Sequence, residues 1–211
     1  MIKIICLYCL TCSFLFCQAQ YPGYTLMDHP DTFKQSFARA TSLTTSIQSD
    51  FSQEKSLTML SEKINSTGKF WYQKEDKLRM QYFQPYDYLM ILNAGKIYVK
   101  DGQKESKISA GSSNVFKQVN RILIDCVSGG MLTNPDFQSQ IWENQGSFLV
   151  ELKPLVKNLK ELYKNINIVL DKKDYSATAI EMDEVSGNKT IIHFKKKEIN
   201  AHIPDTVFNI P

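Results

Sequence analysis

Apolar and polar residues alternate along residues 68–99, a stretch rich in aromatic side chains and methionine. A period of two places the apolar set on one face of a β-sheet and the intervening polar side chains on the other. Polar turns at residues 74–76, at Pro85 and at residues 93–95 divide the stretch into four short antiparallel strands. The alternating apolar set is Phe70, Tyr72, Leu78, Met80 and Tyr82.

Strand patterns recur on both sides of this stretch, whereas helical patterns are few. The total of about eleven strands and three helices lacks the regular alternation of strand and helix that a parallel fold requires. We therefore predict one mainly β (α+β) antiparallel domain. The other strand patterns lie at residues 47–55, 59–72, 107–109, 137–142, 148–153, 166–170, 180–182 and 190–194, and the helical patterns at 28–45, 113–127 and 154–163.

The helix predicted over residues 113–127 is the most amphipathic segment of the chain. Glycines flank it, with Gly111 before it and Gly129 and Gly130 after it. These glycines are consistent with two interpretations, a helix that moves as a unit over the sheet or a fixed helix that they merely cap. Its apolar stripe is Val115, Phe116, Val119, Ile122, Leu123 and Cys126.

The first nineteen residues differ from the rest of the chain. Lys3 is their only charged residue, an apolar run follows to Phe16, and the small residue Ala19 ends the segment. This pattern is typical of a secretory signal peptide, so we expect cleavage after Ala19 and a mature domain over residues 20–211. A lipoprotein signal is disfavoured because bulky residues precede Cys17. Cys126 is then the only cysteine of the mature chain, which excludes a disulfide framework.

Composition and motifs give little support to an enzyme or a nucleic-acid-binding protein. The net charge of the 211 residues is +3, and no phosphate-binding loop, serine-hydrolase or zinc-protease motif is present. His29, His193 and His202 are far apart in sequence, so no metal site and no cofactor is expected. A hydrolase that uses Cys126 or an exposed carboxylate is the weakest of the functional hypotheses.

Apolar surface in excess is the main functional signal. One interpretation is a sheet packed directly on its helices. The other is a curled sheet whose helices enclose a hydrophobic cavity lined by methionine and aromatic side chains, which suit variable apolar ligands.

The chain also resembles the periplasmic lipoprotein-carrier (LolA-like) family. The resemblance rests on Phe51-x-Gln53-x-Lys55, Gly68-Lys69-Phe70-Trp71-Tyr72, Lys77-Leu78-Arg79-Met80-Gln81-Tyr82 with Pro85, and Ile91-Leu92-Asn93-x-Gly95. Similar segments follow from Leu152-Lys153-Pro154 through Thr190-Ile191-Ile192-His193-Phe194 to Ile203-Pro204-Asp205-Thr206-Val207-Phe208.

The resemblance implies an incomplete antiparallel β-barrel with a helical lid over a hydrophobic cavity. It further implies a monomeric, non-enzymatic carrier of acylated lipoproteins in the periplasm. Its partners would be an inner-membrane lipoprotein-releasing ABC transporter and, as an open alternative, an outer-membrane acceptor. The residues assigned to acyl-chain contact are Phe51, Phe70, Tyr72, Leu78, Met80, Tyr82, Leu89, Ile91, Phe116, Val119, Ile122 and Leu123.

Lys74 stands where the family often has an arginine, so the resemblance assigns it to cargo release. Lysine keeps the positive charge but lacks the planar donor geometry of arginine. We expect its ammonium group at the rim of the cavity, near the backbone of a lid element. A second hypothesis remains open, a periplasmic sensor that binds lipid or lipoprotein without transferring it.

Overall fold

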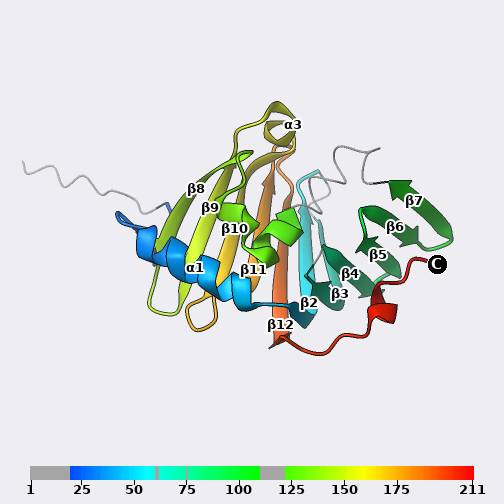
Figure 1. The fold of residues 1–211 in the computed structure, drawn as a ribbon. Coiled ribbons are helices and arrows are strands. Elements are labelled where there is room, and N and C mark those ends of the chain that lie inside the picture. The colour runs from blue at the N-terminus through cyan, green and yellow to red at the C-terminus, as the bar shows by residue number, and fades with distance from the viewer. Residues whose placement is uncertain (1–19, 60–61, 75, 110–121) are drawn as a thin grey trace, which may run out of the picture.

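Twelve antiparallel strands form one open, curled sheet (Figure 1) in the computed structural model, which describes residues 20–59, 62–74, 76–109 and 122–211. The strand order is β1-β8-β9-β10-β11-β12-β2-β3-β4-β5-β6-β7. The strands are β1 (Thr25–Leu26), β2 (Ser46–Leu57), β3 (Glu62–Gln73), β4 (Lys77–Gln84), β5 (Tyr88–Asn93), β6 (Lys96–Asp101), β7 (Lys104–Ser109), β8 (Phe137–Glu143), β9 (Ser147–Pro154), β10 (Tyr163–Asp171), β11 (Ala177–Glu184) and β12 (Lys189–Ile199).

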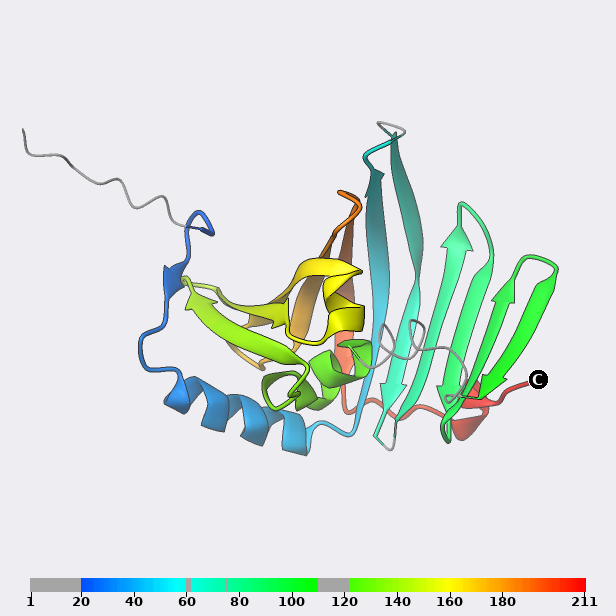
Figure 2. The same cartoon turned by 90° about the horizontal axis from the view of Figure 1, so that it is seen from above.

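The helices lie mainly against the β8–β12 half of the sheet. Helix α1 (Asp31–Leu43) crosses in front of these strands, and a helix over residues 122–128 lies between α1 and the sheet (Figures 1 and 2). The one-turn helix α3 (Lys157–Lys160) joins β9 to β10, and short 3-10 turns cover Gly130–Leu132 and Asp205–Phe208. The predicted mainly β, incomplete barrel with a helical lid is confirmed.

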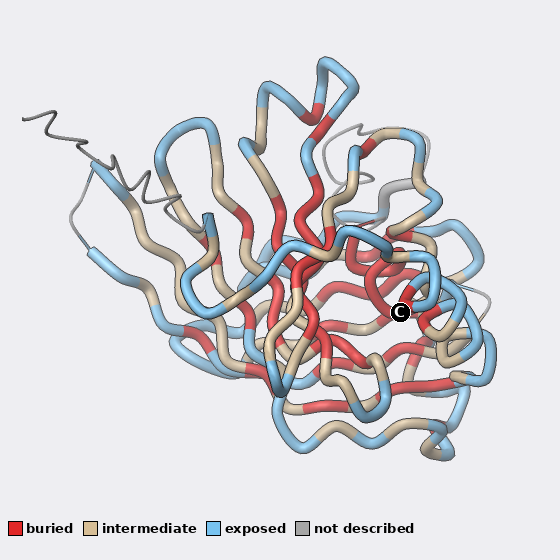
Figure 3. Tube along the Cα trace, turned by 90° about the vertical axis from the view of Figure 1, so that its left-hand side faces the viewer, coloured by how far each residue is buried: buried red, intermediate tan, exposed pale blue. Residues whose placement is uncertain are grey.

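The register of the strands gives the sheet a continuous apolar inner face. In one half Phe70 pairs with Met80, and Met80 with Met90. In the other half Val150, Ile168, Ile180 and Ile192 follow one another across β9 to β12. All of these side chains are buried, and the buried positions form a band through the middle of the molecule (Figure 3).

The helices differ in detail from those that the sequence predicts. Helix α1 begins after Pro30, and no side chain caps its N-terminus. The segment predicted as a helix over residues 154–163 is helical only from Lys157 to Lys160, because its ends belong to β9 and β10. Of the predicted helix over 113–127, residues 113–121 lie outside the described residues. The rest of it is helical and ends at Gly129, which has a φ of 88°.

The two ends of the described chain cover parts of the outer face. Near the N-terminal end, the ring of Tyr21 packs edge-on against that of Trp142, with 5.2 Å between centroids. At the C-terminal end, Arg79 Nη1 donates to the carbonyl oxygen of Val207 at 3.0 Å, and the buried Phe208 follows. No helix in the described ranges is both long and apolar enough to span a membrane.

Gly68 lies where the neighbouring strands leave no room for a side chain. It pairs with Phe51 on β2, and an added β-carbon would lie 2.1 Å from the backbone oxygen of Gln81 and 2.6 Å from the Phe51 ring. We predict that Gly68→Ala lowers the free energy of unfolding by about 3 kcal/mol, since overpacking a filled site forces the backbone to shift. Urea denaturation measures the change.

Gly146→Ala is the matched control for this substitution. An added β-carbon there would meet only Asn144 Oδ1, at 4.0 Å, so the free energy of unfolding should change by no more than about 0.5 kcal/mol. Equal stability of the two variants would contradict the close packing at Gly68.

Candidate lipid-binding face

The inner face of β2, β3 and β4 brings together most of the side chains that the sequence assigns to acyl-chain contact. Phe51, Phe70, Tyr72, Leu78 and Met80 are buried in the main hydrophobic cluster, and Tyr82 packs against it half-buried. The rings interlock edge to face, with centroids 4.8 Å apart for Phe51 and Tyr82. Such pairs fix the orientation of the rings as well as burying apolar area.

The tyrosines of this face are uncharged at neutral pH. Burial raises the pKa of Tyr72 to about 12, with a smaller contribution from Asp76, and burial also raises that of Tyr88 to about 12. The Tyr82 hydroxyl donates to Gln53 Oε1 at 2.9 Å, which satisfies its polar end. The rings can therefore present apolar surface to a ligand without an ionised group beside it.

Leu89 and Ile91 do not share this face, which corrects the sequence-based assignment. They pair with Gln81 and Arg79, whose side chains point to the outer face. Ile91 is buried there, on the side of the sheet that the C-terminal segment covers. Met90 and Leu92 take the inner positions instead, paired with Met80 and Leu78.

The helix over residues 122–128 covers part of the inner face. Ile122 and Leu123 are buried in the same cluster as Phe70 and Met80, whereas Phe116 and Val119 lie outside the described residues. Beneath the helix, Val127, Ile47, Phe70 and Phe194 help to line a pocket of about 10 Å³. A space of this size holds one water molecule, so an acyl chain can enter here only if the helix moves away from the sheet.

Lys74 lies at one end of this face and contacts helix α1. Its ammonium group donates to the carbonyl oxygen of Ser42 in the last turn of α1, and its backbone N–H donates to the Thr45 oxygen at 2.8 Å. A cation at a helix C-terminus is favourable because the last carbonyl groups carry partial negative charge. The contact places Lys74 beside the backbone of α1, and its part in cargo release stays a prediction.

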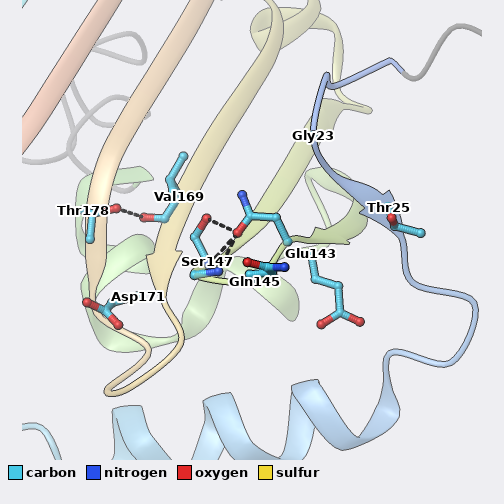
Figure 4. Close-up of a pocket in the computed structure, with 10 residues that line it drawn as sticks. Gly23, Thr25, Glu143, Gln145, Ser147, Val169, Asp171 and Thr178 are labelled. Atoms are coloured by element: carbon cyan, nitrogen blue, oxygen red, sulfur yellow. Dashed lines mark hydrogen bonds between the residues drawn. The ribbon is translucent and has the colours of Figure 1, made fainter.

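A larger groove of about 1150 Å³ lies on the other side of the sheet (Figure 4). It is lined by the N-terminal segment and by the turns that follow β8 and β10, and most of the residues that line it carry polar side chains. Asn144 Oδ1 accepts hydrogen bonds from the Ser147 backbone and hydroxyl groups, and Lys172 pairs with Glu143 at 2.7 Å. These groups hold the turns together, and their polarity does not suit an acyl chain.

The residues considered for catalysis or metal binding are dispersed. His193 is exposed, as the strand alternation predicts, and Cys126 is a buried free thiol whose pKa is raised by burial and, less, by Asp125. A thiol of this kind is a poor nucleophile because it stays protonated. Among the described residues, no group of three or more His, Cys, Asp or Glu side chains is placed to hold a metal ion.

A family model described as outer membrane lipoprotein carrier protein LolA matches residues 42–211. The chain belongs to the LolA family. The fold and the family together indicate a protein that binds lipid or lipoprotein. No curated protein matches the sequence of this LolA-family chain.

Solved structures share the LolA fold at low sequence identity. MucB of Pseudomonas aeruginosa, in its complex with MucA, has a TM-score of 0.52 and 12% identity over 85% of this chain and 60% of that one. An uncharacterised conserved protein of Thermus thermophilus has a TM-score of 0.51 and 6% identity over 87% and 95% of the chains. A LolA superfamily protein of Nitrosomonas europaea has a TM-score of 0.44 and 9% identity over 84% and 97%.

The apolar helix over 122–128 gives a prediction for Leu123→Asp. A carboxylate in a permanently closed core costs several kcal/mol, whereas a helix that opens to water can expose it. We expect the variant to remain folded, with a cooperative melting transition, and to lose binding of a fluorescent fatty acid. Circular dichroism and fluorescence titration measure the two effects.

Ile168→Asp is the control, because Ile168 lies fully buried on β10 between two other strands. This variant should unfold. If Leu123→Asp unfolds in the same way, the helix is a fixed part of the core.

Proposed function

We propose that this protein is a periplasmic carrier that takes up the acyl chains of lipoproteins and transfers them from the inner to the outer membrane. The observation that carries the proposal is the continuous apolar inner face, covered in part by helices, in a chain that belongs to the LolA family. The leader over residues 1–19 would direct export and be cleaved after Ala19. Residues 20–211 would act as a monomer that needs no cofactor.

The acyl chains would lie against the inner face once the helix over 122–128 has moved. The helix side chains Ile122, Leu123 and Val127 would then turn toward the ligand or toward water. Phe116 and Val119 remain predictions from the sequence. The sheet residues in contact would be Phe51, Phe70, Tyr72, Leu78, Met80 and Tyr82, together with Met90 and Leu92.

The energetics of acyl burial require a partner that loads the cargo. Each buried methylene contributes about 0.8 kcal/mol, so one long chain gains on the order of 10 kcal/mol. Two or three fully buried chains would exceed the practical limit of about 20 kcal/mol for non-covalent affinity. Opening of the packed helices offsets part of this gain. Loading by an ABC transporter in the inner membrane and transfer to an acceptor in the outer membrane fit such a balance.

A sensor that binds lipid or lipoprotein without transferring it is the second candidate. The likeness to MucB, solved in complex with the separate protein MucA, supports it, because that structure shows a similar fold bound to a protein partner. The two functions differ in whether cargo leaves with the protein.

The experiment that separates them is lipoprotein release from spheroplasts. We expect the mature chain to release membrane-attached lipoprotein into a soluble one-to-one complex, detected by size-exclusion chromatography and immunoblotting. Binding of lipid without any release of lipoprotein would favour the sensor and reject the carrier.

Lys74→Leu tests the contact with helix α1. The loss of one donor to the Ser42 oxygen should leave the free energy of unfolding within about 0.5 kcal/mol, since the side chain is at the surface. We expect transfer of cargo to outer-membrane vesicles to slow several-fold while binding of cargo persists. Lys69→Leu is the control, because Lys69 is exposed on the outer face of β3, the strand that precedes Lys74. Equal transfer by both variants would show that the α1 contact has no role in release.

A further inference from the structure

Five hairpin connections emerge at the end of the sheet that lies opposite Lys74. Because neighbouring strands are antiparallel, these are the β9–β10, β11–β12, β2–β3, β4–β5 and β6–β7 connections. Hydrogen bonds join three of them side by side. Val185 N donates to the Leu162 oxygen at 3.0 Å, and Thr58 Oγ1 donates to the Gly187 oxygen at 2.7 Å.

These turns carry most of the large apolar side chains that the described chain exposes. Six of the eight lie here, and we call this set the apolar rim. Met59, at the tip of the β2–β3 hairpin, is 96% exposed. Of the other two, Leu43 lies at the opposite end of the sheet, where α1 ends, and Leu26 lies in β1. The apolar rim consists of Met59, Phe83, Tyr86, Leu155, Val156 and Val185.

Lysines surround the β9–β10 part of the rim. Lys153, Lys157, Lys160 and Lys164 flank Leu155 and Val156, and all four are exposed. Residues 153–164 contain one acid, Glu161, so the segment has a net charge of +3 (four lysines minus one glutamate). Glu161 forms only a loose ion pair with Lys157, because 3.9 Å separates Lys157 Nζ from Glu161 Oε1 and both side chains are exposed. At the neighbouring turn, Glu184 is already paired with Lys55.

We propose that the apolar rim docks on an anionic phospholipid surface. Apolar side chains on the tips of separate turns can enter the boundary between headgroups and acyl chains, and the lysines of 153–164 lie where they can meet lipid phosphates. Phe83 and Tyr86 suit this boundary, since aromatic rings concentrate at membrane interfaces. The positive charge of the segment favours an anionic surface. The proposal goes beyond the carrier function, because it needs no ligand on the inner face.

The test is sedimentation of residues 20–211, free of cargo, with vesicles. We expect binding to vesicles of phosphatidylglycerol and phosphatidylethanolamine in equal parts and little binding to pure phosphatidylcholine. Binding should weaken as salt is raised, because the lysine attraction is screened. The double variant Met59→Ser/Leu155→Ser should reduce partitioning at least tenfold. Lys157→Gln/Lys160→Gln should reduce it about tenfold on anionic vesicles only.

Leu43→Ser is the control, because Leu43 is 66% exposed but lies at the opposite end of the sheet. It should bind vesicles as the parent chain does, and all variants should share the parent melting temperature. Absence of vesicle binding by the parent, or an equal loss in Leu43→Ser, would overturn the proposal. So would a rim variant that binds vesicles normally but loses a cross-link to a membrane protein, an outcome that assigns the rim to a protein partner. Fatty-acid binding by the same variants is measured as well, because it tests the inner face independently of membrane docking.

Discussion

The pairing of β12 with β2 is the constraint on which the rest of the structure depends. Strands β2 to β7 follow one another as hairpins, and so do β8 to β12, so each set alone would be a smaller sheet with its own open edge. The register that sets Phe194 opposite Phe51 joins the two sets. It makes one inner face out of two, and it lets helices that pack on one half bury side chains of the other. The β12–β2 pairing joins distant parts of the chain, and closing so long a loop costs entropy. Burial of the apolar inner face, which the pairing completes, must offset this cost.

The helix over residues 122–128 packs on part of the inner face. Beneath it, next to Phe70 and Phe194, the remaining space is only about 10 Å³. An acyl chain bound here, as proposed, would make apolar contacts of the same kind and would compete with the helix for one surface. Its affinity would then depend on the difference between two similar burial terms.

The sequence predicts this fold well wherever apolar and polar residues alternate. Phe70, Tyr72, Leu78 and Met80 share a face as the period of two requires, and His193 points outward for the same reason. The pattern fails in β5, where Tyr88-Leu89-Met90-Ile91-Leu92 is apolar throughout, so periodicity cannot say which side chains face inward. Ile91 can be apolar on the outer face only because residues from the far end of the chain cover that side, a long-range contact that local pattern does not encode. The position of Lys74 could be anticipated from its place at a strand end, but its partner on α1 could not.

The C-terminal segment has a consequence for the order in which the molecule becomes complete. Asn93 Nδ2 and Arg79 Nη1 both donate to its carbonyl oxygens, and Lys77 pairs with Asp205 at 2.8 Å. Ile91 lies on the outer face of β5, which this segment covers, and the cover is synthesised after all twelve strands. A chain stopped short of it would leave an apolar patch on the outside of an otherwise formed sheet. Such a patch distinguishes an unfinished molecule from a finished one, and proteases and chaperones that recognise exposed apolar surface can act on that difference.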